Sequence, residues 1–303
     1  MDHNKLGRSF VDQTVTQLSW RIVLEPSESK TPIALVTGGS AGLGIEIVLA
    51  MLGAGYDVAI VGRNQDRLQQ ASERIDIAVQ SSGRRVKLVV GDVSDKDSAD
   101  RMFADLQADW GRLDVLVNCV GLSDRGRVED LTGARVNELI DANVLSALYC
   151  SQAALPMLRA SGGVVVNIGS LSSKVGARYL GGYSLAKHAL AGLSQQMRLE
   201  WREYGVHVAL INPGPIQRPD AGVRYTSQGT NLPESARLPA GGAKLSGLPP
   251  ERVAAAVLMC VQRRYPDLIL PRHMRLMVAI GHAAPRIGDW LLLKFTSNRG
   301  SKD

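Results

Sequence analysis

The amino-acid sequence predicts a doubly wound α/β fold, in which one parallel sheet carries helices on both faces. Two observations support this prediction. From Thr31 onward, short runs of β-branched residues alternate with longer segments of helical periodicity. A glycine-rich turn joins the first of these runs to the first helical segment. A chain of 303 residues can bury one substantial core, so we expect a single domain of this class.

The strands are expected where the β-branched runs occur, because near-continuous apolar runs are typical of parallel strands buried on both faces. They are residues 33–36, 58–61, 86–90, 115–117, 164–168, 206–211 and 268–270. Helical periodicity predicts helices that include 45–52, 65–79, 96–110 and 134–158. The stretch from Gln217 to Pro250, rich in Gly, Pro, Ser and Arg, interrupts this alternation. An irregular insertion of this length inside a compact domain is usually functional or disordered.

Composition narrows the classes of function. The net charge is +6, but basic and acidic residues interleave, so we expect no nucleic-acid partner. Cys119, Cys150 and Cys260 are far apart and form no C-x-x-C pair, which argues against a disulfide framework and a metal site. The first 32 residues lack the apolar core of a secretory signal, and no apolar run is long enough to span a bilayer. We expect a cytoplasmic protein, either soluble or peripheral at a membrane surface.

The glycine-rich turn is T-G-G-S-A-G-L-G, from Thr37 to Gly44. Glycines at such a turn let the backbone approach a pyrophosphate, and the following helix offers N–H groups and a positive dipole end. A tight loop without a ligand is the alternative. The expected cofactor contacts here are Gly38, Ser40, Gly42, Leu43 and Gly44.

Arg63 follows the second strand, at the place where an NAD enzyme tends to carry an acidic residue for the ribose hydroxyl. A guanidinium suits a 2′-phosphate instead, and the Ser40 hydroxyl could contact the same phosphate. NADP(H) is therefore the favoured cofactor and NAD(H) the alternative, unless Arg63 merely ends a solvated strand. After the third strand, Asp92 could accept from the adenine amino group while Val93 packs on the ring.

Further motifs follow in order: Asn118-Cys119-Val120-Gly121, Asn143, Ser170, Y-S-L-A-K from Tyr183 to Lys187, and Pro213-Gly214. With these motifs the chain resembles the short-chain dehydrogenase/reductase family over about residues 32–270. The family usually has N-N-A-G or N-A-G there, and Cys119 and Val120 are apolar replacements within this motif. The resemblance implies a Rossmann-type seven-stranded sheet in the order 3-2-1-4-5-6-7, cofactor contacts at Asn118 and Gly121, and a homodimer or homotetramer.

The resemblance also implies a catalytic tetrad of Asn143, Ser170, Tyr183 and Lys187. Hydride transfer to a ketone leaves an alkoxide, which the phenol of Tyr183 can protonate. Lys187 lies one turn along the same helix face, so its ammonium can lower the pKa of that phenol and hold the nicotinamide ribose. Ser170 can polarise the carbonyl. Asn143, midway along a predicted helix, resembles the family residue whose backbone carbonyl binds a water in a proton relay to Lys187.

The segment Asn212-Pro213-Gly214-Pro215-Ile216 resembles the family loop that packs on the nicotinamide. Pro213, Gly214 and Ile216 are the expected contacts, with the N–H and C=O of Ile216 at the carboxamide. Arg218 stands where many relatives carry a threonine, and it either reaches an anionic group or is solvated. We expect substrate choice to depend on residues 172–182 and on a loop at about 217–248.

The domain expected at 32–271 leaves extensions at 1–31 and 272–303. Residues 10–24 have nearly helical apolar spacing, and residues 276–280 and 287–295 are apolar clusters on either side of Pro285. Basic residues surround the two C-terminal clusters: Arg272, Arg275, Arg286 and Lys294. Such segments either fold over the core, form a subunit interface, or lie in a membrane interface and bring a lipophilic substrate to the site.

Together these features predict an NADP(H)-dependent oxidoreductase that interconverts a carbonyl compound and an alcohol, most simply a ketone reductase. The alternative is an NADP(H)-binding regulatory protein of the same fold without turnover. Loss of tetrad residues would indicate that alternative, and the sequence has lost none. The nature of the ketone does not follow from the sequence, because specificity depends on site geometry.

Overall fold

The computed structural model describes residues 31–218, 225, 228, 232–233, 236 and 246–296, apart from the side chains of 295 and 296. All elements below belong to one compact unit, Pro32–Asp303. The helical pattern expected within residues 10–24 and most of the expected substrate loop lie outside the described residues.

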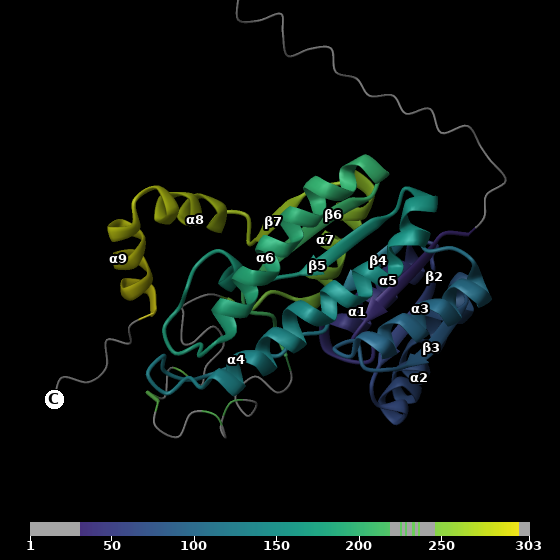
Figure 1. Cartoon of the computed structure of the whole chain (residues 1–303), viewed down its shortest axis with the longest axis horizontal. Coiled ribbons are helices and arrows are strands. Elements are labelled where there is room, and N and C mark those ends of the chain that lie inside the picture. The colour runs from purple at the N-terminus through teal and green to yellow at the C-terminus, as the bar shows by residue number, and fades with distance from the viewer. Residues whose placement is uncertain are drawn as a thin grey trace, which may run out of the picture. The chain divides into compact units, whose positions relative to one another are not determined.

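Seven strands form one parallel sheet in the order β3-β2-β1-β4-β5-β6-β7 (Figure 1). They are β1 Ile33–Thr37, β2 Asp57–Gly62, β3 Val86–Val90, β4 Val115–Asn118, β5 Val164–Ile168, β6 His207–Pro213 and β7 Asp267–Leu270. The strand order reverses between β1 and β4, which creates the switch point where ligands of doubly wound sheets bind. The predicted fold class and strand order are confirmed.

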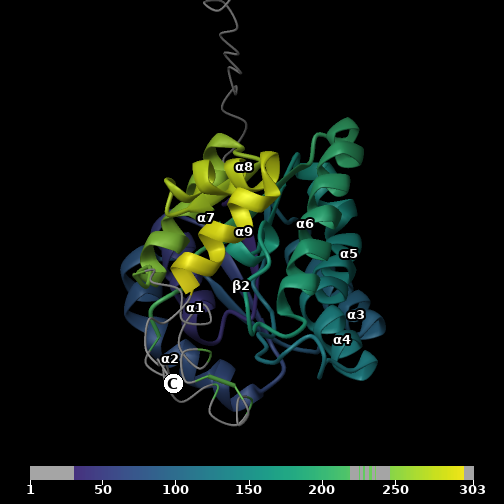
Figure 2. The same ribbon diagram turned by 90° about the vertical axis from the view of Figure 1, so that its left-hand side faces the viewer.

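Helices cover both faces of the sheet (Figure 2). On one face lie α1 Gly42–Gly53, α2 Gln65–Ser82 and α7 Pro250–Arg263, and on the other α3 Lys96–Trp110, α5 Ser146–Ser161 and α6 Tyr183–Glu200. We call the core beneath α1, α2 and α7 the first core, and the core beneath α3, α5 and α6 the second core. Within β1, Ala34 and Val36 pack into the first core, while Ile33 and Leu35 pack into the second. Alternate residues of a strand point to opposite faces, so a strand covered on both sides needs an unbroken apolar run.

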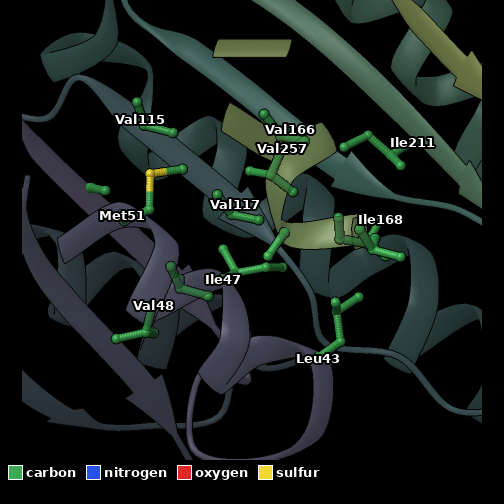
Figure 3. Close-up of a cluster of buried hydrophobic side chains, with 14 of the residues drawn as sticks. Leu43, Ile47, Val48, Met51, Val115, Val117, Val166, Ile168, Ile211 and Val257 are labelled. Carbon is green, nitrogen blue, oxygen red and sulfur yellow. The ribbon is translucent and has the colours of Figure 1, made fainter. Parts of the chain in front are cut away.

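The first core shows how α1 is held against the sheet. Ile47 and Met51 of α1 point at the side chains of β4 and β5, and Val257 of α7 closes the cluster (Figure 3). Leu43, in the first turn of α1, lies in the same core. Burying its side chain fixes the start of α1 at the carboxyl end of the sheet.

One predicted helix is divided in the structure. Residues 134–158 were expected to form a single helix, but the chain forms α4 Gly133–Ile140, a π-turn η1 Asp141–Leu145, and then α5. The side chain of Asn143 donates hydrogen bonds to the carbonyls of Leu139, at 2.8 Å, and Leu122, at 2.9 Å. Apolar spacing continues through this turn, so helical periodicity does not reveal it.

The remaining elements lie near the carboxyl edge or beyond the last strand. They are the 3₁₀ turns η2 Leu171–Ser173 and η3 Trp201–Tyr204, and the helices α8 Met274–Ala283 and α9 Pro285–Thr296. The two C-terminal apolar clusters are thus helical, and Pro285 begins the second helix. Over the ranges that the structure describes, no helix combines the length and hydropathy needed to cross a bilayer.

Candidate active site

The glycine-rich turn forms a cradle between β1 and α1. Gly38 has φ +68°, a backbone conformation that favours glycine, and its N–H donates to Val61 O at 2.8 Å. A Cβ added to Gly44 would lie 2.1 Å from Gly38 O, so the turn cannot close around a side chain there. Among the described residues, no side chain caps the N-terminus of α1. Its N–H groups and dipole fit an anionic group such as a pyrophosphate.

The residues expected at the adenine and at the 2′-phosphate of its ribose lie close together at the carboxyl edge of the sheet. Arg63 follows β2 and Asp92 follows β3, and Nη1 of the arginine lies 3.5 Å from Oδ2 of the aspartate. The Arg63 side chain is 76% exposed, so this pair stabilises the fold little. Ser40 Oγ would lie 3.4 Å from a Cβ on Gly62, which places this hydroxyl beside the end of β2. Burial alone would raise the pKa of Asp92, but hydrogen bonds from Ser94 and the Arg63 guanidinium together lower it.

Two expected cofactor contacts have side chains that point into the protein. Val93 is buried and packs in the second core, so little of it is available to an adenine ring. The Asn118 amide donates to Asn167 Oδ1 at 2.8 Å and to Ser151 Oγ at 3.0 Å. Its side chain thus links β4 to β5 and α5, and a cofactor contact at Asn118 would have to use the backbone. A polar residue at a strand end can bind a cofactor or hold neighbouring elements together, and the sequence alone does not distinguish these two roles.

Asn143, Gly121 and Lys187 lie close together just beyond the end of β4. Asn143 is 1% exposed, and within the described residues its Oδ1 accepts no hydrogen bond. A Cβ on Gly121 would lie 2.8 Å from that oxygen and 3.3 Å from Lys187 Nζ. Glycine at 121 therefore leaves room for the Asn143 amide oxygen and the Lys187 ammonium. The π-turn that positions Asn143 is of a kind often found at functional sites.

Tyr183 begins α6, one turn before Lys187, and the Lys187 Nζ lies 5.8 Å from the Tyr183 ring centroid. Lys187 is buried and donates to Ile168 O at 2.9 Å. Ser170 follows β5 and hydrogen-bonds to the Tyr183 side chain, while its Oγ accepts from Ser172 N at 3.1 Å. Strand β5 and helix α6 thereby bring the three predicted catalytic side chains to one place.

The protonation states differ in part from the prediction. Burial lowers the pKa of Lys187 to about 8. Burial also raises the pKa of Tyr183, and the hydrogen bond with Ser170 and the charges of Arg218 and Arg125 oppose this rise only in part. The prediction that the ammonium leaves Tyr183 with a lowered pKa is therefore wrong for this structure, because desolvation of the phenolate is the larger effect. Tyr183 is a protonated acid at neutral pH.

The loop after β6 pairs its backbone with the segment just before α7, through the bridge between Ile216 and Leu248. Gly214, which follows Pro213 at the end of β6, donates its N–H to Leu270 O at 2.7 Å. The Pro215 carbonyl and the Gln217 N–H both bond to Leu248, at 2.7 and 2.9 Å. Successive backbone groups of an extended segment point to opposite sides, so the N–H and C=O of Ile216 point away from Leu248. They are oriented to meet a separate partner such as a carboxamide.

Arg125 is a residue near the site that the sequence motifs did not reveal. It is 7% exposed, and its guanidinium donates to Ala236 O at 2.8 Å and to Asp124 O at 2.7 Å. It also lies 3.8 Å from the ring centroid of Tyr225. Tyr225 and Ala236 belong to the expected substrate loop, so Arg125 links that loop to the region of Tyr183. A single arginine in an irregular segment carries no spacing signal by which it could have been found.

The sheet order and the glycine turn at the switch point define the Rossmann-like class of α/β proteins. A family model described as short chain dehydrogenase matches residues 32–228. The chain belongs to this family and is an oxidoreductase of alcohol and carbonyl groups.

Known proteins are similar over most of this domain. A 3beta-hydroxysteroid dehydrogenase of Mediterraneibacter gnavus is 30% identical over 188 residues, which are 62% of this chain and 67% of that protein. An uncharacterized oxidoreductase of Staphylococcus aureus is 34% identical over 185 residues, 61% of this chain and 78% of its own. Among solved structures, an alcohol dehydrogenase from Thermococcus sibiricus complexed with 5-hydroxy-NADP has a TM-score of 0.65 and 26% identity, covering 80% of this chain and 96% of its own.

Proposed function

We propose that this chain is an NADP(H)-dependent oxidoreductase that reduces a ketone to an alcohol, with Asn143, Ser170, Tyr183 and Lys187 as its catalytic residues. The observation that carries the proposal is the meeting of Ser170, Tyr183 and Lys187 at the carboxyl edge of the sheet, on the side where the glycine cradle opens. When bound, the nicotinamide cofactor supplies the hydride in reduction and accepts it in oxidation.

Each residue has a separate part in this chemistry. Tyr183, kept protonated by burial, donates its proton to the carbonyl oxygen as the alcohol forms. Ser170 hydrogen-bonds the same oxygen and orients it. Lys187, a cation below its pKa of about 8, stabilises the negative charge that Tyr183 acquires. The Asn143 side chain and Lys187 both lie beside Gly121, and a water on the Asn143 backbone carbonyl would complete a proton relay to Lys187.

The preference for NADP(H) over NAD(H) rests on Arg63 and Ser40. The guanidinium is largely exposed at the end of β2, and the serine hydroxyl lies beside that strand end. A similar alcohol dehydrogenase from Thermococcus sibiricus was solved with 5-hydroxy-NADP. Asp92 lies 3.5 Å from Arg63, a long and exposed contact that a 2′-phosphate could replace. We also propose that the protein is cytoplasmic and forms a homodimer or homotetramer, and light scattering on the purified chain would test the oligomeric state.

The test combines cofactor titration with turnover. NADPH and NADH binding is followed by nicotinamide fluorescence, and then carbonyl compounds from small diketones to long-chain and sterol ketones are added. We expect NADPH oxidation with part of this panel. The Tyr183→Phe variant should bind NADPH nearly as tightly as the natural chain but turn over at least about a hundredfold more slowly. Unchanged turnover in this variant would refute the catalytic assignment, and binding without any turnover in the natural chain would favour a regulatory protein.

A further inference from the structure

Exposed apolar side chains gather on the two C-terminal helices. Eleven large apolar residues are exposed in the described part of the chain, and five of them lie on α8 and α9. These five are Leu276, Ile280, Ile287, Trp290 and Leu293. Scattered exposed apolar residues are normal, but a concentration of them on one short segment marks a surface that is covered by something else.

On each of the two helices, the exposed apolar side chains lie along one side of that helix. On α9, Ile287, Trp290 and Leu293 recur every three residues, which places them along one side of the helix. On α8, Leu276 and Ile280 lie one turn apart. Their side of α8 faces away from Val278, which is buried against Leu171 and Ile269. We call this set of five residues the outer face.

Helices α8 and α9 pack against each other, and we call this pair the hairpin. A Cβ on Gly288 would lie 2.6 Å from the Cα of Gly281, so the helices cross at two glycines in close contact. The ring Nε2 of His282 lies 2.7 Å from Lys174 O, which ties α8 to the segment after η2. Figure 1 shows α8 and α9, in yellow, as a pair beside the sheet and its covering helices. The outer face is therefore presented by folded helices.

Basic residues accompany the outer face. Residues 271–296 contain four Lys or Arg residues and one acidic residue, a net charge of +3 with neutral histidines. Arg286 and Lys294 lie on the same side of α9 as Trp290, and Lys294 Nζ is 4.7 Å from the Trp290 ring centroid. Tryptophan and aliphatic residues with flanking cations are the composition of helices that lie in an anionic membrane interface.

We propose that the outer face docks this protein on a bilayer that contains anionic lipid. A second copy of the chain fits the face less well, because a two-fold contact would place the basic residues of both copies in one interface with only one acidic residue from each copy, Asp289, to offset them. Docking does not depend on the proposed reaction. Since Val278 packs against Leu171, the neighbour of Ser170, the hairpin would hold the substrate side of the site close to the membrane surface.

The test is flotation of the full chain with vesicles of phosphatidylcholine alone or with about one third phosphatidylglycerol. We expect binding to the mixed vesicles, weaker binding to neutral ones, and release by high salt. The double variant Trp290→Ser/Leu293→Ser should bind mixed vesicles at least about tenfold more weakly. Ile77→Ser is the matched control, because Ile77 is 80% exposed but lies on α2, and it should bind like the natural chain.

A second variant, Arg286→Gln/Lys294→Gln, tests the charge without removing apolar surface. It should lose the difference between mixed and neutral vesicles. Circular dichroism and NADPH titration show whether each variant is folded. Equal vesicle binding by the natural chain and the serine double variant would overturn the proposal. It would also fail if the natural chain bound no vesicles, and a smaller oligomer mass of the double variant would then mean that a second copy covers the face.

Discussion

Lys187 is the residue for which burial has the clearest chemical consequence. Its ammonium lies in the protein with a single backbone acceptor, Ile168 O, at 2.9 Å in the described structure. Desolvation disfavours the cation and brings the pKa down to about 8. Burial acts in the opposite direction on Tyr183, whose neutral form it favours. The site therefore holds a proton donor that is secure at neutral pH beside a cation that titrates just above it.

This arrangement predicts the pH dependence of ketone reduction. Between pH 6 and 10, kcat/KM should be level on the acid side and fall as pH rises through about 8, where Lys187 loses its proton. The Cys119→Ala variant is a control. Burial raises the pKa of this neighbouring thiol to about 11, so removing the thiol should leave the fall of kcat/KM near pH 8 unchanged. A rate that stays level beyond pH 9.5 would contradict the prediction.

Over part of this pH range, the contribution of Lys187 to the free energy of unfolding should rise while kcat/KM falls. The folded pKa of Lys187 is lower than the ordinary value of 10.5, so between about pH 8 and 10.5 the unfolded chain binds more protons. The contribution of Lys187 to the free energy of unfolding therefore increases with pH in this window. Urea unfolding of the natural chain and of Lys187→Met at pH 7.5 and 9.5 should show a smaller gap in favour of the methionine variant at the higher pH. A gap that widens with pH would reverse the sign.

Arg63 should distinguish the two cofactors. Its exposed guanidinium can bond a 2′-phosphate, and one charged hydrogen bond contributes roughly 1.5–3 kcal/mol. Arg63→Ala should therefore raise the Kd for NADPH by about tenfold to a hundredfold and leave the Kd for NADH nearly unchanged. Arg74→Ala is the matched control, an exposed arginine farther along α2. Equal weakening for both cofactors would mean that Arg63 does not recognise the phosphate.

At the scale of elements, local sequence patterns predict the strands and the capped helices, but they do not predict contacts that a single side chain makes without a repeating pattern. The seven strands are apolar runs, and α2 and α3 start at Asn64 and Asp95, whose side chains cap them, so these elements follow from local rules. The π-turn at Asn143 depends on hydrogen bonds to Leu139 and Leu122, and neither bond leaves a periodic signal. The same reason hides Arg125, whose partners come from a distant loop.

Asn143 should stabilise its π-turn as well as line the site. Both hydrogen bonds end on carbonyls, and the Asn143 side chain is almost fully buried, so Asn143→Ala leaves two acceptors without their donor. We expect a loss of about 2–3 kcal/mol in the free energy of unfolding by urea. Asn64→Ala, which removes an exposed helix cap, should cost only about 1 kcal/mol. Similar losses for the two variants would show that the π-turn does not depend on the amide.

At the scale of the whole molecule, the sheet is complete before the C-terminal hairpin begins. Strand β7 ends at Leu270 and pairs with β6 along its length. Among the described side chains of the hairpin, Val278 is the buried one, and it packs in a small cluster with Leu171 and Ile269. The motif order in the sequence predicts a domain that ends at about 271, and the register of β7 explains physically why a domain could end there.

A chain that ends at Pro271 should therefore still unfold in one cooperative transition. Losing the contact of Val278 removes about 1–3 kcal/mol, which for a domain of this size lowers Tm by a few degrees. The full-length Val278→Ala variant should reproduce part of this decrease, because it removes most of the same contact. NADPH binding should persist in both, since the glycine cradle and Arg63 lie on β1, β2 and α1 and their turns. A shortened chain without a cooperative transition would show that the hairpin belongs to the folding unit, and the sheet would then owe its stability to a segment outside its own two cores.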